Sequence, residues 1–417
     1  MKIYLDVYGC TANKSDAAII RGLIASHPKY SLVSNPEQAD AFVILTCTVI
    51  DTTEQRMLHK IKKMNAFQKP LIISGCMASV QKEKLNTLFP SAQLLPPDQV
   101  HKVITLLEGK KETEEQPDKY HIPKCFSSAI AQISIAEGCS STCSYCITRL
   151  ARGPLKSYPK ESIIRDVNDA VKQNCVEIQL TAQDTASYGL DTGSNLGALL
   201  QHIGSIPGSH RIRVGMMNPS HALRYLPKLI SAFTNEHIFK FIHLPVQSGS
   251  DDILTRMNRN YTVSDFQRII DAFRKHYPLI TISTDLIVGF PTETDDDFDK
   301  SVQLIEDVKP DIVNITRFSA RPYTTAKTMQ GRIPTNIVKQ RSQHLTHVCS
   351  RISEEKNKQY LGQIHSISII EPGKLQSMIG RTDTYKPVIV KTCVPIGSRL
   401  QVEITDASSI YLVGKII

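Results

Sequence analysis

The feature that most constrains the fold is a repeated alternation of apolar strand-like segments with helix-like segments. The first 107 residues contain three such strands, KIYLDV, AFVILT and PLIISG, and each precedes a helical pattern, around residues 16–26, 53–67 and 79–89. Strands that alternate with helices in this way are typical of a parallel sheet with helices packed on its faces. We therefore predict an α/β domain over residues 1–107.

The same alternation resumes after a short interruption. Residues 108–128 are charged, contain prolines and lack apolar periodicity, so we predict a linker there. From residue 129 onward, six longer strand-like segments follow: AQISIAEG, VEIQLTAQD, RIRVGM, FKFIHLPV, ITISTDLIVGF and DIVNITRF. Six strands with crossover helices predict a partial or open TIM-like (βα) barrel over residues 129–333, with its active site at the carboxyl ends of the strands.

The C-terminal part has a different sequence pattern. Residues 334–359 are predicted to form one long polar connecting helix. Residues 360–417 contain short alternating strands that are separated by turn residues such as Pro372-Gly373 and Gly397. Short strands with regular turns predict a small antiparallel β-barrel, an architecture that often holds oligonucleotides.

The composition favours a polyanionic partner and an intracellular location. Lys and Arg outnumber Asp and Glu by 49 to 40, which gives a formal charge of +9 and favours RNA only when it accompanies an RNA-binding segment. The N-terminus lacks the features of a signal peptide, and no apolar run approaches the length of a membrane span. We predict a cytoplasmic protein that does not contact a membrane, in which the ten cysteines serve as metal ligands or core residues rather than disulfides.

Three cysteines lie within eight residues in the segment EGCSSTCSYCI, at Cys139, Cys143 and Cys146. A structural zinc site has four protein ligands and disulfides need even numbers, so a group of three suggests a metal centre with one free position. No second cysteine pair follows, and Cys175 stands alone. Three thiolates on a four-iron cluster would leave one iron open. The trio follows the first strand of the predicted barrel, which places it at the catalytic end.

A second trio consists of Cys10, Cys47 and Cys76, each of which follows a strand of the N-terminal domain. Ligands of open α/β sheets bind at the carboxyl ends of the strands, so these cysteines could converge at one edge. The alternative is that they are small buried hydrophobic residues. Their shared position in successive βα units favours a second three-thiolate site.

The spacing Cys139-x3-Cys143-x2-Cys146, with Tyr145 before the last cysteine, resembles the radical S-adenosylmethionine (SAM) signature. The resemblance extends over nearly the whole chain to the methylthiotransferase family, whose C-terminal TRAM domain is similar to the predicted small barrel. The segments that carry it are CSYCITRLARGPLKSYP, EIQLTAQDTASYG, HLPVQSGS, LTRMNRNYT, STDLIVGFPTET and GRTDTYKPV.

This resemblance implies two 4Fe-4S clusters, one on each cysteine trio, together with SAM and an electron donor protein. In that family, SAM is cleaved to a 5′-deoxyadenosyl radical, and a methylthio group is inserted at an unactivated C–H bond.

The segment YGCTANKSDA resembles the archaeal and eukaryotic subgroup that acts on N6-threonylcarbamoyladenosine (t6A) next to the anticodon of tRNA. The implied reaction is methylthio insertion at C2, from t6A to ms2t6A. Alternatives within the family are isopentenyladenosine in tRNA and an aspartate of a ribosomal protein. An alternative from another class is a non-enzymatic RNA-binding protein whose fold is held together by metal.

Seven further residues at predicted strand ends are candidate cofactor contacts, with turn formation as the alternative; these are Gln183, Asp184, Gln247, Ser248, Asp285, Gly289 and Glu293. Arg149 and Arg152 follow the cysteine trio and could contact phosphate or the SAM carboxylate. The candidate RNA contacts are Arg152 together with Arg381, Tyr385 and Lys386 in GRTDTYKPV. The thirteen histidines are scattered without metal-ligand spacing, and none of them is assigned to catalysis; the catalytic residues are left unassigned.

Overall fold

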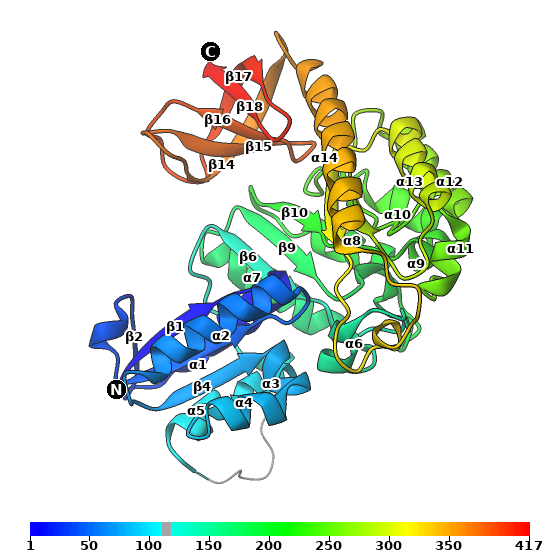
Figure 1. Cartoon of the computed structure of the whole chain (residues 1–417). Helices are drawn as coiled ribbons and strands as arrows, with labels where there is room; N and C mark the ends of the chain where they lie inside the picture. Colours follow the sequence, from blue (N-terminus) through cyan, green and yellow to red (C-terminus); the bar gives the residue numbers. More distant parts are fainter. Residues whose placement is uncertain (111–117) are drawn as a thin grey trace.

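The computed structural model describes residues 1–110 and 118–417. Figure 1 shows a C-shaped arrangement, with the N-terminal α/β domain at the lower left, the central barrel at the right and the C-terminal barrel at the upper left. Residues 111–117, part of the predicted linker, lie outside the described residues. Beyond them, Lys119 and Lys124 are both buried and paired with carboxylates.

The N-terminal domain contains a five-stranded parallel sheet in the order β2-β1-β3-β4-β5. The predicted strands form as β1 (Lys2–Val7), β3 (Ala41–Thr46) and β4 (Leu71–Gly75). The sheet edges are the three-residue strands β2 (Ser31–Val33) and β5 (Gln93–Leu95), which are too short to show a period in the sequence. The helices are α1 (Thr11–Ser26), α2 (Asp51–Asn65), α3 (Cys76–Val80), α4 (Lys82–Leu88) and α5 (Val103–Leu107).

All six strands predicted for the central region form, and they pair in parallel. They make two three-stranded sheets, β10-β9-β6 and β11-β12-β13, joined by a bridge between Ile212 and Ile238. The strands are β6 (Ile130–Ser134), β9 (Glu177–Thr181), β10 (Arg211–Val214), β11 (Phe241–His243), β12 (Thr281–Val288) and β13 (Ile312–Arg317). One continuous hydrophobic core fills the space between these strands and their helices. The predicted partial (βα) barrel is confirmed.

The helices of the central barrel lie around its strands (Figure 1). They are α6 (Ile147–Arg152), α7 (Lys160–Lys172), α8 (Leu196–Gly204), α9 (Pro219–Arg224), α10 (Leu226–Ala232), α11 (Asp251–Arg256), α12 (Val263–His276) and α13 (Asp295–Val308). A short antiparallel pair, β7 (Ala136–Glu137) with β8 (Lys156–Ser157), flanks the loop that carries Cys139, Cys143 and Cys146. In the described part of the chain, none of the helices has the length and apolarity that a membrane crossing needs.

The C-terminal region begins with the long helix α14 (Thr335–Lys358), which packs on β13 and α13. The closed barrel that follows has the strand order β14-β15-β16-β18-β17, as predicted. One of its pairings, β16 with β18, is parallel, so the barrel is not purely antiparallel. Its strands are β14 (Ile364–Pro372), β15 (Met378–Thr382), β16 (Pro387–Val390), β17 (Arg399–Ala407) and β18 (Leu412–Ile416).

Candidate functional site

The loop that carries Cys139, Cys143 and Cys146 is fixed by hydrogen bonds from several parts of the barrel. Asn258 Nδ2 donates to the Thr142 carbonyl at 2.8 Å, from the segment after α11. Two more contacts come from Arg149 Nη1, which donates to the carbonyls of Cys139 at 3.1 Å and Ser141 at 2.9 Å. These contacts hold the backbone of the loop and leave the cysteine sulfur atoms free to bind a ligand.

The thiols of this loop lie in an environment that suits metal ligation. Burial, and to a smaller extent the carboxylate of Asp184, raise the pKa of Cys139 to about 11. Arg259 Nη1 lies 3.3 Å from the Cys143 sulfur. Burial also raises the pKa of the Cys146 thiol. Thiols of high pKa become ligands only when a metal displaces their protons, and the Arg259 cation favours the anionic ligand that results.

The N-terminal trio also gathers at one place, around the starts of two helices. Cys10 caps α1, Cys76 begins α3, and Cys47 follows β3. Gly9 has a φ of +102°, and a Cβ on it would lie 2.9 Å from the Cβ of Cys47, so a side chain is excluded there. Burial raises the pKa of Cys76 to about 11, the Arg152 guanidinium lowers it, and the neighbouring Cys10 and Cys47 thiols raise it.

Each trio supplies three thiolates, the ligand type of an iron-sulfur cluster, and each cysteine of a four-iron cluster binds a different iron. Across residues 1–110 and 118–417, no three Cys, His, Asp or Glu side chains are grouped closely enough to hold one metal ion.

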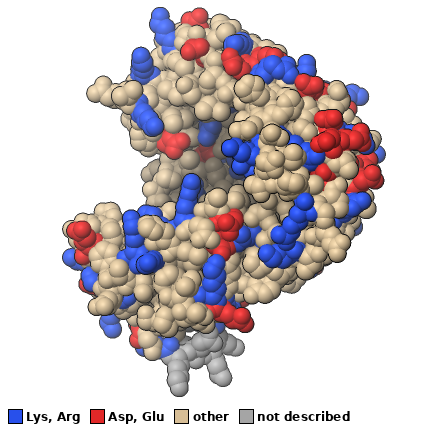
Figure 2. Space-filling view, in the orientation of Figure 1, with Lys and Arg blue, Asp and Glu red and all other residues tan. Residues whose placement is uncertain are grey.

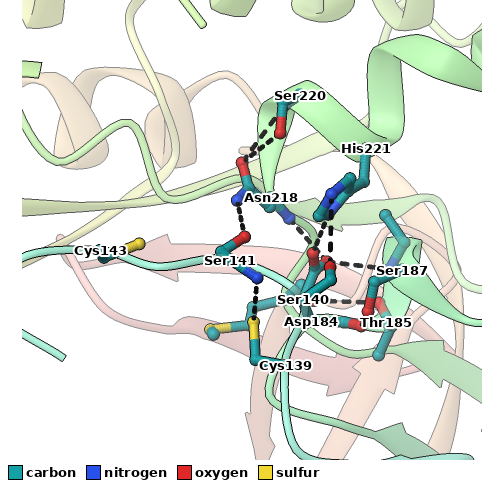
Figure 3. A network of polar contacts seen from close by, with 12 residues as sticks. Cys139, Ser140, Ser141, Cys143, Asp184, Thr185, Ser187, Asn218, Ser220 and His221 are labelled. Carbon is teal, nitrogen blue, oxygen red and sulfur yellow. Dashed lines mark hydrogen bonds and ion pairs between the residues drawn. The ribbon is translucent and has the colours of Figure 1, made fainter. Parts of the chain in front are cut away.

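Next to the barrel trio lies a network centred on Asp184 (Figure 3). Its carboxylate accepts hydrogen bonds from the backbone nitrogens of Ala186 at 3.0 Å and Asn218 at 2.9 Å, and lies 2.5 Å from His221 Nδ1. Asn218 Nδ2 in turn donates to Ser141 Oγ at 2.9 Å. Asp184 was predicted to contact the cofactor, but the structure gives it protein partners and a role in orienting the cysteine loop.

The contribution of Asn218 and His221 could not be read from the sequence in advance. Both follow β10 and come close to the cysteine loop, and His221 Nε2 lies 3.5 Å from Ser140 Oγ. Their position just beyond a barrel strand, in the segment MNPSH, was the available signal.

Three predicted cofactor residues are occupied by contacts within the protein. Ser248 is buried, and its Oγ accepts from the Ser250 nitrogen at 3.2 Å. Gly289 has a φ of +78°, and a Cβ there would lie 2.4 Å from Val338. Glu293 accepts a hydrogen bond from the Gly289 nitrogen at 2.9 Å. These contacts shape the loop after β12.

The other three candidates remain suited to ligand binding. Gln183 Oε1 is buried and has no hydrogen-bond partner in the described part of the chain. Gln247 adopts a φ of 73° and bonds through its backbone nitrogen to the Asp285 carbonyl at 2.8 Å. The Asp285 carboxylate is half-buried, 2.8 Å from His243 Nε2 and 2.7 Å from Asn314 Nδ2. These partners fix its orientation inside the barrel.

Arg152, predicted to contact RNA or the SAM carboxylate, is instead buried between the N-terminal domain and the barrel. Its guanidinium donates to Glu137 Oε1 at 2.5 Å, Asp16 Oδ2 at 2.8 Å and Asn13 Oδ1 at 2.9 Å. A guanidinium enclosed by carboxylates does not reach a phosphate in solution. The structure therefore corrects that assignment.

Tyr385 and Lys386, also predicted to contact RNA, attach the C-terminal barrel to the central one. The Tyr385 hydroxyl donates to Glu177 Oε1 at 2.7 Å, and its ring packs against Phe239 and Phe241. Lys386 is buried, and its Nζ donates to Asp311 Oδ1 at 2.8 Å. Both side chains are therefore interface residues, which corrects the prediction.

Arg381 is the fourth predicted RNA contact. Its guanidinium lies 4.5 Å from the centre of the Tyr385 ring and is half-buried. Its Nε is buried and has no hydrogen-bond partner within residues 1–110 and 118–417. Of the four predicted RNA contacts, Arg381 remains a candidate to bind an anionic partner.

Replacing Lys386 with Met should lower the free energy of unfolding by about 3 kcal/mol, because removal of one partner leaves a buried carboxylate poorly paired. The loss stays at the lower end of the usual range because Lys356 Nζ still lies 2.7 Å from Asp311 Oδ2. Denaturant unfolding measures the effect, and exposed Lys415→Met is the matched control. Equal stability of the two variants would contradict the interface role.

Comparisons with known proteins give the same three parts. Family models match as "Uncharacterized protein family UPF0004" over residues 2–96, "Radical SAM superfamily" over residues 133–305 and "TRAM domain" over residues 358–417. A solved structure, the radical SAM methyltransferase TsrM from Kitasatospora setae, has a TM-score of 0.59 at 12% identity and covers 78% of this chain and 73% of its own. That likeness concerns the fold.

Curated relatives match along the full chain. A protein of Archaeoglobus fulgidus is 40% identical, with 100% of this chain and 99% of the relative covered, and one of Methanothermobacter thermautotrophicus is 38% identical, with 99% of both covered. Both are named "Probable threonylcarbamoyladenosine tRNA methylthiotransferase". A human relative, "Threonylcarbamoyladenosine tRNA methylthiotransferase", is 30% identical over 99% of this chain and 74% of its own length. The cysteine sites, the order of the domains and these matches together place the chain in the threonylcarbamoyladenosine tRNA methylthiotransferase family of radical SAM enzymes.

Proposed function

We propose that this enzyme inserts a methylthio group at C2 of t6A next to the anticodon of tRNA, converting t6A to ms2t6A. The observation that carries the proposal is the presence of two separate three-cysteine sites in a chain that matches t6A methylthiotransferases along its full length. When bound, the two clusters and SAM supply the radical chemistry and the sulfur that an unactivated C–H bond requires.

The barrel site would hold the radical-generating cluster through Cys139, Cys143 and Cys146. Tyr145, between two of these ligands, packs edge-on against Phe290 with 6.3 Å between ring centres. This contact covers the loop on one side and keeps water from it. The chain's own contribution is therefore to orient the loop and to exclude solvent.

SAM would bind beside the open position of this cluster, within reach of Gln183, Gln247 and Asp285. Gln183 offers a buried acceptor without a partner, and the Asp285 carboxylate is held in place by His243 and Asn314. Amide and carboxylate oxygens could accept hydrogen bonds from the amino or ribose hydroxyl groups of SAM.

The second cluster would lie on Cys10, Cys47 and Cys76, close to the first. Helix α6 begins directly after Cys146, and it packs against α3, which begins at Cys76. The two sites therefore share one packed region between domains, which suits a reaction that joins a substrate carbon with sulfur.

The shape and charge of the molecule support a tRNA substrate. Figure 2 shows a deep hollow between the N-terminal domain and the C-terminal barrel, with Lys and Arg side chains on its borders. A pocket in this region is lined by Lys14 and Arg21 of α1, Gln132 of β6 and Glu371 of β14. An anticodon loop can present a single base to a pocket while its stem is held through phosphates. We also propose that the reaction takes place in the cytoplasm and that a donor protein supplies the electrons.

Mass spectrometry of tRNA nucleosides from cells with and without the gene tests this function. We expect ms2t6A to disappear and t6A to accumulate when the gene is deleted, and both changes to reverse when it is restored. Loss of a methylthiolated isopentenyladenosine instead would assign another substrate. Unchanged nucleosides would remove tRNA from the proposal.

A further inference from the structure

Arg152 occupies a special position between the two cysteine sites. It is the last residue of α6, a helix of six residues whose N-cap is Cys146. Such a helix is about 9 Å long, from a rise of about 1.5 Å per residue. Because α6 packs on α3, the Arg152 end of the helix lies beside the N-terminal site while the other end belongs to the barrel site.

Both outer nitrogens of Arg152 donate hydrogen bonds, and their partners come from both domains. Nη1 bonds to Glu137, which precedes the barrel cysteine loop, and Nη2 bonds to Asp16 and Asn13 on α1. Helix α1 itself starts at the capping residue Cys10. The guanidinium is therefore held in one orientation by contacts on either side of the domain boundary.

A second cation, Lys119, completes this network without approaching the cysteines. Its Nζ donates to Asp16 Oδ1 at 3.0 Å and to the Pro97 carbonyl at 3.1 Å, and it also pairs with Glu137. Burial raises the pKa of Glu137, but Lys119 and Arg152 hold it at about 2, so this carboxylate is ionised at neutral pH. Two carboxylates and two cations balance each other in the buried cluster.

The inner nitrogen of Arg152 has no such engagement. Arg152 is only 5% exposed, and its Nε is buried without a hydrogen-bond partner in the described ranges. A buried N–H without an acceptor costs about 1 to 3 kcal/mol. Cys76 is the first residue of α3, the helix against which α6 packs. The acceptor that this N–H lacks is thus available on the N-terminal site as a thiolate or a cluster sulfide.

We propose that Arg152 is a positioning residue of the N-terminal iron-sulfur site, where its Nε–H donates a hydrogen bond to a sulfur atom. Glu137, Asp16 and Asn13 bond to the two outer nitrogens, which leaves Nε as the nitrogen without a protein acceptor in the described ranges. Hydrogen bonds to cluster sulfur atoms help to set the reduction potential, and a donor stabilises the more negative, reduced state. The inference rests on the proposed function, because it requires a cluster on Cys10, Cys47 and Cys76.

The test uses the full chain with Cys139, Cys143 and Cys146 replaced by Ala, so that the N-terminal cluster is the one measured. Iron analysis and a redox titration followed by electron paramagnetic resonance give the content and the potential. In this background Arg152→Gln should reduce the ratio of reduced to oxidised cluster at a fixed applied potential by about tenfold, which is about 59 mV for a one-electron couple.

Lys119→Met is the matched control, because it breaks the same carboxylate network without removing a donor to sulfur. We expect its potential to equal that of the parent. Arg152→Lys keeps the charge but lacks Nε–H, and it should shift in the same direction as Arg152→Gln; it also serves if the Gln variant does not fold.

An unchanged potential in both Arg152 variants, with normal iron content, would overturn the role of Arg152 and leave the proposed function intact. An equal shift in Lys119→Met would also overturn it, because the effect would then come from loosening of the network. A parent protein without iron at the N-terminal site would overturn this inference and the two-cluster function together.

Discussion

Replacing Cys143 with Ala should abolish reductive cleavage of SAM and leave the N-terminal cluster in place. Two cysteines cannot hold a four-iron cluster that also needs one iron open for SAM, so the barrel site loses its cofactor. The barrel loop itself should stay folded, because its backbone is held by Asn258 and Arg149 rather than by the thiol. Anaerobic reconstitution followed by quantification of 5′-deoxyadenosine and iron measures both results.

Iron content should fall from about eight to about four atoms per chain in this variant, as one of two four-iron clusters is lost. The control is Cys393→Ala, since Cys393 is exposed on the C-terminal barrel and away from both sites. Normal 5′-deoxyadenosine production by the Cys143 variant would refute the assignment of this trio. A colourless parent protein that binds zinc would instead support the non-enzymatic alternative.

The position of the two cysteine trios could be predicted from the sequence, because each trio follows strands of a parallel sheet. Side chains that follow successive strands meet at one edge of the sheet, so recognising KIYLDV, AFVILT and PLIISG as strands was sufficient to group Cys10, Cys47 and Cys76. The structure brings all three close to one another and to Arg152. The strands could be recognised in the sequence because β3 and β4 are buried along their whole length and are therefore mostly apolar.

The burial of the cations Arg152 and Lys386 could not be predicted in the same way. Arg152 pairs with Asp16, 136 residues earlier, and Lys386 pairs with Asp311, 75 residues earlier. A charged residue in a strand or helix is ordinarily exposed, and nothing local indicates that another domain supplies a carboxylate. From the sequence we expect the cations of RLARG and TDTYKPV to contact RNA, whereas Arg152 and Lys386 pair with carboxylates of other domains.

The Asp184 network also shows that the sequence does not predict which side chains pair, here between loops of one domain. The sequence places Asp184 at the end of β9 and Asn218 after β10, where a ligand contact is expected. The Asp184 carboxylate accepts from the Asn218 backbone nitrogen, and the Asn218 side chain donates to Ser141 across the mouth of the barrel. Strand order predicts which loops meet there, but the pairing of particular side chains depends on the loop backbone.

Replacing Cys10 with Ala should stop methylthio insertion while SAM cleavage continues at the rate of the unmodified enzyme. Cys10 is the best of the N-terminal trio for this test, because it is exposed whereas Cys47 and Cys76 are buried, and loss of a buried sulfur also disturbs packing. The two cysteine sites belong to different domains, so loss of the N-terminal cluster leaves the barrel ligands in place.

Incubation with tRNA, SAM and a reductant, followed by nucleoside mass spectrometry, measures ms2t6A and 5′-deoxyadenosine in the same sample. Iron should again fall by about half, and Cys393→Ala, an exposed cysteine on the C-terminal barrel, should retain full iron and both products. Together with the Cys143 variant, the result assigns one step to each site, because each variant then loses a different product. If the Cys10 variant keeps its iron and still forms ms2t6A, Cys10 is not a cluster ligand and the N-terminal cysteines are ordinary packing residues.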